Sequence, residues 1–383
     1  SNMVQELSYE LSERGYNITV CTTVVSNRTI SDNNVAIEID SNLVENGVKV
    51  VRIKSVHQFS SNFIIRGFSQ ILLPHLLYKK IKKINNKIDI VFAYSPPLAW
   101  AVLGGLIKKK YGARLILNVQ DIFPQNAIDI SVLKNKLLIK YFEHQEKKVY
   151  ESADKLTSHT KMSRDFLIIK KEVPPSKIEL ITNWIDVPLY TKEKDISYYR
   201  EKYNLKNNFI FLFAGVMGPS QGLDLIIEIA QKIRFEYPSI CFLFVGNGIE
   251  KKRLMEKTLK YNLKNVVFKP LVSNDDYPKL LKSVDVGIVC LSSLNKTGVY
   301  PAKVFGYMAS SLPVCSILHK ESDGHELVKE SGCGLSVFSD ESEKVIRNLI
   351  IKMFNEKGNL KQYGENGYKY VSKHYSKIKC INM

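Results

Sequence analysis

The chain has 383 residues, of which 45% are hydrophobic and 24% charged, an ordinary composition for a folded protein longer than a usual single domain. Two domains are therefore expected. The six cysteines lie far apart, with no Cys-x-x-Cys pair and no histidine at metal-ligand spacing, which argues against a structural zinc site and a disulfide framework.

The net charge of +17 is unevenly distributed along the sequence. Residues 49–148 hold 18 Lys and Arg against 5 Asp and Glu, a balance of +13. Such an excess predicts an anionic partner. Because no zinc-finger spacing, RNP-type aromatic motif or helix-turn-helix pattern is present, nucleic acid is not the expected partner. A polyphosphate substrate and an acidic membrane surface remain as interpretations.

The first segment is a predicted helix over residues 4–14, in which Glu6 and Glu10 interrupt any signal-peptide pattern. Together with the separate cysteines, this predicts a cytoplasmic protein. A doubly wound domain opens with a strand and a phosphate-facing turn before its first helix. We therefore expect that the first strand of the N-terminal domain, within roughly 20–30 residues, is missing from this sequence.

Short β-branched or aromatic segments then alternate with longer helical patterns, which predicts an α/β protein with two doubly wound, Rossmann-like domains. The predicted strands are 17–23, 49–53, 88–93, 114–119, 209–214, 240–245, 265–268, 286–289 and 313–317. The uncharged stretch 90–107 is as long as a membrane span, but Pro96 and Pro97 would break a helix there. It predicts a buried strand, a turn and a helix.

A polar stretch at 187–194 separates the two halves, and the alternation restarts at Phe209. The predicted N-terminal domain is 1–187 and the predicted C-terminal domain is 188–366. The last helix is predicted at 367–376, and the segment 367–383 is expected to cross back to the first domain.

Two glycine-rich turns in the second half could hold a diphosphate, because backbone N–H groups at a helix start are uncovered there. The first contains Gly215, Gly218, Gln221 and Gly222. The second contains Gly246 and Gly248. Taken alone, each turn also fits a plain connection between a strand and a helix.

A sharper motif is Tyr300-Pro301-Ala302-Lys303, in which Pro301 predicts a helix start. Lys303 then falls in the first turn, where the helix dipole already favours phosphate. The alternative is a solvated helix lysine.

Taken in order, these segments resemble glycosyltransferase family four, which has the GT-B fold. Within the family, the sequence is similar to the bacterial O-antigen and capsule branch that includes N-acetyl-L-fucosamine transferases. The segments that carry the resemblance are 118–124, 182–186, 215–223, 245–248, the strand ending at Phe268, 300–303 and 307–309.

The resemblance implies a retaining transferase without a metal or other cofactor. Its C-terminal domain would hold a nucleoside-diphosphate sugar, expected to be UDP-linked, and its N-terminal domain the acceptor, with reaction in the cleft between them. Lys303 and Asp121 are the implied catalytic residues, Lys303 on the diphosphate and Asp121 on the sugar or acceptor. A helix cap or loop carboxylate is the alternative for Asp121. The other implied donor-site residues are Gly215, Gly218, Gln221, Gly222, Gly246, Gly248, Phe268 at the base, Tyr300 and Pro301.

The sequence departs from the family pattern at several positions. Two glutamates separated by seven residues are usual, but Gly298 and Gly306 stand there, so the carboxylate that typically holds the ribose is absent. The usual arginine and lysine of the first glycine turn are replaced by Met217 or Gly218 and by Gln221, which places more of the phosphate binding on Lys303. Gln120 replaces a common histidine.

Three histidines receive no catalytic role. His144 and His159 are expected at the surface or as caps, and His325 on a loop that could approach the donor.

The segment 57–78 is rich in Phe, Ile and Leu and is followed by Lys79, Lys80, Lys82 and Lys83. Apolar bulk beside a lysine cluster favours peripheral docking on the inner, anionic face of the cell membrane, although core packing with a solvated end is the alternative.

The predicted reaction is sugar transfer to a polyprenyl-diphosphate-linked saccharide during O-antigen or capsule synthesis. Two alternatives remain from the sequence. One is a nucleotide-sugar epimerase or phosphorylase on the same scaffold. The other is a catalytically silent partner that binds the donor or the membrane. This alternative is motivated by Gly298 and Gly306, which stand in place of the usual glutamates.

Overall fold

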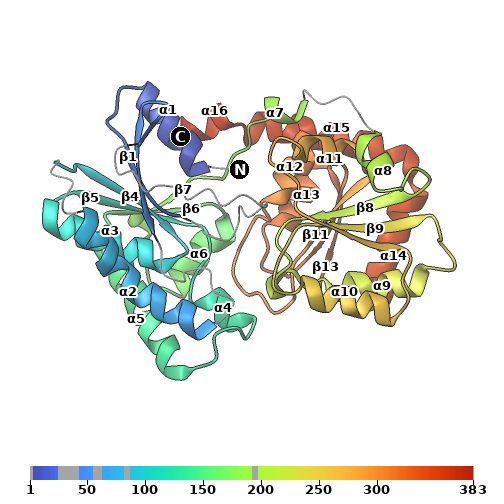
Figure 1. The fold of residues 1–383 in the computed structure, drawn as a ribbon, viewed down its shortest axis with the longest axis horizontal. Helices are drawn as coiled ribbons and strands as arrows, with labels where there is room; N and C mark the ends of the chain where they lie inside the picture. The colour runs from blue at the N-terminus through green and yellow to red at the C-terminus, as the bar shows by residue number, and fades with distance from the viewer. Residues whose placement is uncertain (1–2, 25–42, 55–62, 82–86, 192–196, 383) are drawn as a thin grey trace. The chain divides into compact units, whose positions relative to one another are not determined.

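The computed structural model describes residues 3–24, 43–54, 63–81, 87–191 and 197–382 (Figure 1). The chain forms two compact units. The first consists of Ser1–Phe123, Tyr141–Thr157 and Ser176–Glu179, and the second of Pro124–Lys140, Ser158–Pro175 and Leu180–Met383.

The first half of the chain forms two sheets. One has the order β1-β3-β2, in which β1 (Thr19–Val24) is parallel to β3 (Val48–Lys54) and β2 (Leu43–Glu45) is antiparallel to it. The other has the order β4-β5-β6-β7, with β4 (Ile90–Ser95) parallel to β5 (Arg114–Val119), followed by β6 (Lys155–Ser158) and β7 (Ile178–Leu180). The helices of this half are α1 (Met3–Glu13), α2 (Phe63–Ile81), α3 (Leu98–Tyr111), α4 (Gln125–Asp129), α5 (Lys136–Ser152) and α6 (Lys161–Ile169).

Helix α3 packs closely on the second sheet because it carries small residues where it meets the strands. A Cβ at Gly104 would lie 2.8 Å from Leu115 Cδ1, so only glycine allows this approach. Leu103 and Ile107 of the same helix join a core cluster with Leu73 and Leu77 of α2. Burial of each such side chain contributes roughly 1.5–3 kcal/mol.

The second unit contains a six-stranded sheet of order β10-β9-β8-β11-β12-β13, in which every adjacent pair is parallel. Its strands are β8 (Phe209–Ala214), β9 (Ile240–Val245), β10 (Val266–Lys269), β11 (Val286–Cys290), β12 (Val314–Leu318) and β13 (Gly334–Phe338). The four strands β8, β9, β11 and β12 are buried over their whole length. Their continuous apolar sequences suit a parallel sheet covered on both faces.

Helices cover both faces of this sheet. Figure 1 shows α12 (Lys303–Ala309) and α13 (Gly324–Ser331) on one side, and α9 (Asp224–Ile233) and α10 (Lys251–Lys260) on the other. Two core clusters correspond to these faces, one containing Val304 and Leu327 and the other Ile226 and Leu254. The remaining helices are α7 (Pro188–Thr191), α8 (Tyr198–Lys202), α11 (Tyr277–Lys282), α14 (Glu343–Asn355), α15 (Lys357–His374) and α16 (Lys377–Ile381), with single 3₁₀ turns at Pro175–Lys177 and Pro219–Gln221.

The predicted two-domain α/β fold is confirmed, as are all nine predicted strands within about two residues. The stretch 90–107 is strand, turn and helix, as predicted. The sequence missed β2, β6, β7 and β13, and its last helix was predicted ten residues too late. Helix α15 begins at Lys357 and contains three glycines. A Cβ at Gly364 would lie 2.1 Å from Ser311 O, so only glycine fits the packed face there.

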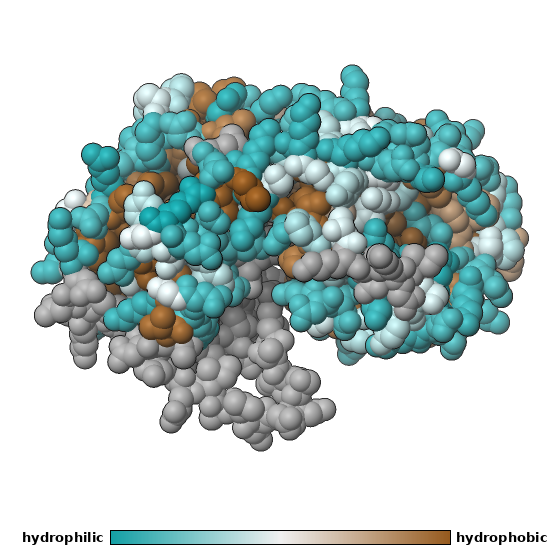
Figure 2. Space-filling model, turned by 90° about the horizontal axis from the view of Figure 1, so that it is seen from above, coloured by the Kyte–Doolittle hydropathy of each residue, from teal (hydrophilic) through white to brown (hydrophobic). Residues whose placement is uncertain are grey.

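The described segments contain no helix that is both long and apolar enough to cross a membrane. The face seen in Figure 2 is mainly hydrophilic, with small apolar areas between hydrophilic ones.

Candidate functional site

The strand order of the six-stranded sheet predicts where a ligand binds. From β8 the chain crosses to β9 on one side, whereas the later strands β11, β12 and β13 lie on the other side. At such a switch point, the loops that leave the carboxyl ends of the two central strands separate, and open α/β sheets bind ligands there. The loops after β8 and β11 therefore define the candidate site.

The two glycine turns pack on each other, backbone against backbone. Gly215 N donates to Val245 O at 2.9 Å, and Met217 N donates to Asn247 O at 2.8 Å, so hydrogen bonding continues past the ends of β8 and β9. A Cβ at Gly246 would lie 2.0 Å from Gly215 O, and one at Gly248 would lie 2.2 Å from Met217 O. Gly246 and Gly248 thus position the first turn, because no larger residue could approach it so closely.

The first turn keeps some of its N–H groups available. Those of Gly215 and Met217 are used by the second turn, and Gln221 N donates to Gly218 O. The N–H of Gly218 donates to no atom of the described residues, and the space where its Cβ would be is open. Gly218 is therefore one predicted backbone donor that the structure leaves free for an anion.

Lys303 reaches this turn from the start of α12. Its Nζ donates to Gln221 Oε1 at 2.6 Å and lies 3.9 Å from the centroid of the Phe213 ring. The side chain is half-buried, and desolvation lowers its pKa to about 7. The structure thus brings Lys303, Gln221 and Gly215 together, as the sequence predicted, and adds Phe213, which sequence reasoning missed.

The loop after β11 holds the turn from the other side. Ser292 N donates to Ser220 O at 2.9 Å, and Asn295 Nδ2 donates to the same oxygen at 3.1 Å. Cys290, the last residue of β11, is buried, and burial raises the pKa of its thiol to about 12. Cys290 is therefore a protonated thiol beside Lys303. Polar residues directly after a buried strand were the available signal for Ser292 and Asn295.

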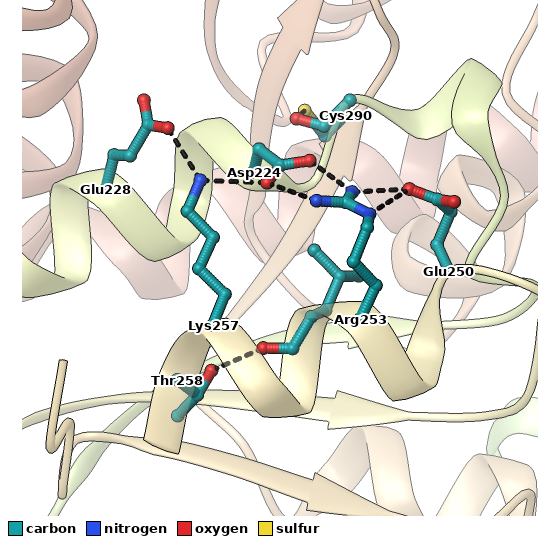
Figure 3. A network of polar contacts seen from close by, with 9 residues as sticks. Asp224, Glu228, Glu250, Arg253, Lys257, Thr258 and Cys290 are labelled. Carbon is teal, nitrogen blue, oxygen red and sulfur yellow. Dashed lines mark hydrogen bonds and ion pairs between the residues drawn. The ribbon is translucent and has the colours of Figure 1, made fainter. Parts of the chain in front are cut away.

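An ion-pair network ties together the helices that follow the two turns (Figure 3). Arg253 of α10 donates to both carboxylate oxygens of Asp224, at 2.9 and 2.5 Å, and also to Glu250. Lys257 donates to Asp224 at 2.8 Å and to Glu228 at 2.7 Å. The hydrogen bond from Arg253 is the main cause that lowers the pKa of Asp224 to about 2. Because these groups are partly exposed, each pair contributes about 1 kcal/mol or less.

The side chains predicted at the base and near the helix start pack largely within the domain. Tyr300 is buried and meets Phe305 and Tyr375 edge to face, so its backbone rather than its ring can reach a ligand. Pro301 is also buried. Phe268 is half-buried and stacks on Phe244 with ring centroids 5.0 Å apart.

Asp121 lies in the first unit, just past the end of β5. It does not cap α4, whose preceding residue is Pro124, so the helix-cap alternative is wrong. Its side chain is accessible, yet partial desolvation by the surrounding protein raises the pKa of the carboxyl. Burial, and then the charge of Asp121, raise the pKa of Tyr94 to about 12, which leaves a protonated hydroxyl near this carboxylate.

The two glycines that replace the usual glutamates differ in their surroundings. A Cβ at Gly298 would lie 2.3 Å from Ser163 N, at the beginning of α6, so no side chain fits there. A Cβ at Gly306 would lie 3.3 Å from Tyr277 Cε1, which is tight but is the end of a movable ring.

The structure places the three histidines named from the sequence on different parts of the chain. His144 is exposed on α5, as expected, but His159 is buried rather than at the surface. The prediction that His325 lies on a loop is wrong, because it belongs to α13, where its ring contacts Ser336 Oγ at 2.7 Å. Within the described ranges, no group of three His, Cys, Asp or Glu side chains could hold a metal ion.

Comparison with known proteins yields two family models that together span nearly the whole chain. Residues 1–188 match the model described as Glycosyltransferase Family 4, and residues 195–370 match the model described as Glycosyl transferases group 1.

Two curated relatives carry provisional assignments. WbjE of Pseudomonas aeruginosa, assigned as a glycosyltransferase, is 24% identical over 72% of this chain and 68% of its own length. WcaI of Escherichia coli K12, assigned to colanic acid biosynthesis, is 27% identical over 58% of this chain. The match spans only 56% of the length of WcaI.

Among solved structures, HepE of Anabaena in complex with UDP-glucose has the same fold. It superposes with a TM-score of 0.69 at 16% identity, over 96% of this chain and 98% of its own.

The packing of the two turns predicts that Gly246→Ala costs about 3 kcal/mol of stability, because the methyl group meets a carbonyl oxygen and the φ angle of 145° is unfavourable for alanine. Gly218→Ala is the matched control, expected to change stability by no more than about 0.5 kcal/mol. Urea unfolding of both variants measures the difference. Equal stabilities would contradict the proposed packing role.

Proposed function

Because the chain belongs to glycosyltransferase family four, we propose that it is a retaining enzyme that transfers a sugar from a UDP-linked donor to a lipid-linked saccharide. The product would be part of a surface polysaccharide. The observation that carries the donor assignment is Lys303, held over Phe213 and against Gln221 at the sheet's switch point. The complex of HepE with UDP-glucose supports UDP as the nucleotide.

The chemistry requires stabilisation of the leaving diphosphate. As the bond from the anomeric carbon to the diphosphate breaks, negative charge accumulates on the phosphate oxygens. The Lys303 ammonium and the N–H of Gly218 would stabilise this charge in a partly desolvated site, where such interactions are strong. An arriving diphosphate would also raise the lowered pKa of Lys303, so the lysine becomes fully charged when the donor is bound.

The ribose needs a partner other than the usual carboxylate. At Gly306, the end of the Tyr277 ring lies where a side chain would extend. The Tyr277 hydroxyl makes no hydrogen bond with the described residues, and burial raises its pKa well above the usual range. We infer that this protonated hydroxyl contacts the ribose in place of the glutamate.

The assignment of the acceptor rests on sequence similarity alone. WcaI is assigned to the synthesis of colanic acid, a polysaccharide. The O-antigen and capsule branch that the sequence resembles acts on polyprenyl-diphosphate-linked saccharides, and Asp121 would orient the acceptor or sugar. N-acetyl-L-fucosamine is the first sugar to test.

The proposed acceptor requires access to a membrane, and helix α2 offers a suitable surface. Leu73 and Leu77 are buried, whereas Leu72 and Leu76 are 59% and 48% exposed on the neighbouring face of the helix, close to the exposed Lys79. The expected contributions of Phe59, Lys82 and Lys83 lie outside the described residues, as do the side chains of Phe63, Ile64, Ile65, Phe68 and Lys80. Exposed leucines beside basic residues fit an anionic lipid surface.

Titration calorimetry with UDP-, GDP- and dTDP-sugars is expected to show binding of the UDP-sugars only. Lys303→Ala should weaken this binding about 10-fold or more, because it removes a charged hydrogen bond to phosphate.

Since the pKa of Lys303 in the ligand-free protein is about 7, the affinity for the UDP-sugar should fall as the pH rises from 6 to 8.5. The donor diphosphate is a diester whose charge is constant over this range. Lys303→Arg, which keeps its charge, should bind without this pH dependence, and an unaffected Lys303→Ala would rule out the donor site.

Tyr277→Phe tests the ribose contact. Loss of one hydrogen bond should weaken UDP-sugar binding about 5-fold. The control ligands are the 2′-deoxy and 3′-deoxyribose forms of the same UDP-sugar, and the variant should lose no further affinity for the one that lacks the contacted hydroxyl. The same loss with all three ligands would show that Tyr277 acts only through packing.

Flotation with vesicles tests the membrane surface. The protein should float with phosphatidylglycerol vesicles and much less with phosphatidylcholine ones. Leu72→Ser combined with Leu76→Ser should reduce the bound fraction about 5-fold or more, because apolar area is lost. Leu259→Ser, which alters a leucine that is 77% exposed on α10, is the matched control. Equal losses in both variants would contradict docking through α2.

A further inference from the structure

The two central strands of the six-stranded sheet, β8 and β11, pair over only two residues. Their pairing ends where Gly287 lies opposite Leu212, whereas β8 pairs with β9 over six residues and β11 with β12 over four. By the alternation of parallel strands, the next hydrogen bond between β8 and β11 would run from Ala214 N to Ile288 O. Both residues are buried, so these two backbone groups need partners of another kind.

The hydroxyl group of Tyr307, on α12, lies where this hydrogen bond would be. It accepts a hydrogen bond from Ala214 N at 3.3 Å, and as a donor it lies 3.3 Å from Ile288 O and 3.4 Å from Leu212 O. Burial raises the pKa of Tyr307 well above its usual range, so the hydroxyl keeps the proton that it donates. One side chain thus satisfies backbone groups of both strands and stands between them.

Strand β11 makes room for the tyrosine ring at Gly287. Tyr307 is fully buried, and a Cβ at Gly287 would lie 2.4 Å from Tyr307 Cδ2 and 2.7 Å from Tyr307 Cγ. Because Cγ is fixed close to the helix backbone, the ring could not move aside for a larger residue unless α12 moved with it. The helix and the strand are therefore matched to each other at this position.

Tyr307 and Lys303 are four residues apart, so they lie on the same face of α12. Lys303 Nζ reaches Phe213, which stands between the two β8 residues that contact Tyr307. Phe213 belongs to the core cluster on the other face of the sheet, so the lysine side chain crosses the carboxyl edge of the sheet. It crosses beside Gly215, where its Cε lies 3.6 Å from the position of a Cβ. This is the end at which β8 and β11 have separated.

We propose that Tyr307 is a positioning residue of the donor site, whose hydroxyl holds β8 and β11 apart and fixes α12 so that Lys303 stays over Phe213. Without the hydroxyl, Ala214 N and Ile288 O would regain partners by bonding to each other, which would close the gap and displace the lysine toward solvent. The role of Lys303 on a diphosphate rests on the proposed function, whereas its positioning by Tyr307 rests on this geometry alone.

Competitive acetylation of the ligand-free protein tests the positioning, because only the uncharged amine reacts and mass spectrometry reports Lys303 separately at each pH. Desolvation lowers the pKa of Lys303 to about 7, although Cys290 acts in the opposite direction, so the labelling midpoint should lie there. Tyr307→Phe keeps the ring and removes the hydroxyl. Its midpoint should rise to about pH 8 or higher, because the displaced amine regains hydration.

Donor binding gives a second measurement on the same variant. At pH 6, where Lys303 is charged in both proteins, Tyr307→Phe should bind UDP-sugars about 5-fold more weakly, because the ammonium is misplaced. The pH at which the affinity falls should rise together with the labelling midpoint.

Two further variants separate positioning from stability. Gly287→Ala presses on the Tyr307 ring from β11 while the hydroxyl is retained, and it should also raise the midpoint. Asn265→Ala is the matched control, because it removes a buried hydrogen bond of 2.9 Å to Ala230 O just before β10. It should lower the melting temperature by about 4 °C, as Tyr307→Phe should, and leave the midpoint of Lys303 unchanged.

The proposal is overturned if Tyr307→Phe leaves the midpoint of Lys303 unchanged, or if Asn265→Ala raises it equally, since Tyr307 would then serve stability alone. A midpoint of about 10 in the unaltered protein, as for an exposed lysine, would also overturn it. Failure of the unaltered protein to bind any UDP-sugar would contradict the donor assignment instead, because the labelling curve is measured without ligand and still decides the role of Tyr307.

Discussion

The contact between the two glycine turns is the constraint on which the donor half of the molecule depends. Because Gly246 and Gly248 have no Cβ, their turn can lie directly against the carbonyl groups of Gly215 and Met217. That contact uses two N–H groups of the first turn and leaves the N–H of Gly218 for a ligand. The partly exposed ion pairs of Asp224 and Arg253 add little to the stability of the fold, but they join the starts of α9 and α10, the helices that follow the two turns.

The fixed turn gives Lys303 its unusual environment. A lysine that is placed between an amide oxygen and an aromatic ring loses part of its hydration, which is why its pKa falls. Without a ligand, the folded protein therefore carries an incompletely compensated site, and a bound diphosphate would offset that cost. Desolvated charges of this kind are common at functional sites, because a charge acts most strongly where its solvation is poorest.

Much of this arrangement was predictable from the sequence, because strong local signals coincide with the fold. Continuous apolar runs marked the buried strands, and glycines after strands marked the turns. The sequence could not show that Gly246 and Gly248 serve packing whereas Gly218 faces open space, since that distinction depends on distances between β8 and β9. Strands β6 and β7, with four and three residues, were too short for periodicity to detect. In α15, the glycine at position 364 is explained by its close contact with Ser311, which is distant in sequence.

The two glycines in place of the family's glutamates show how similar departures in sequence can differ physically. At Gly298, a side chain would have to displace the backbone at the beginning of α6, so that position is committed to packing. At Gly306, a Cβ would lie 3.3 Å from Tyr277 Cε1 and 3.6 Å from Tyr190 Cε1, which are side-chain rather than backbone atoms. The first change has therefore removed a carboxylate and filled its space with backbone. At the second, the Tyr277 hydroxyl lies 3.6 Å from where the Cβ would be. Because a neutral hydroxyl can still form a hydrogen bond, we expect ribose recognition there to survive the loss of the charge.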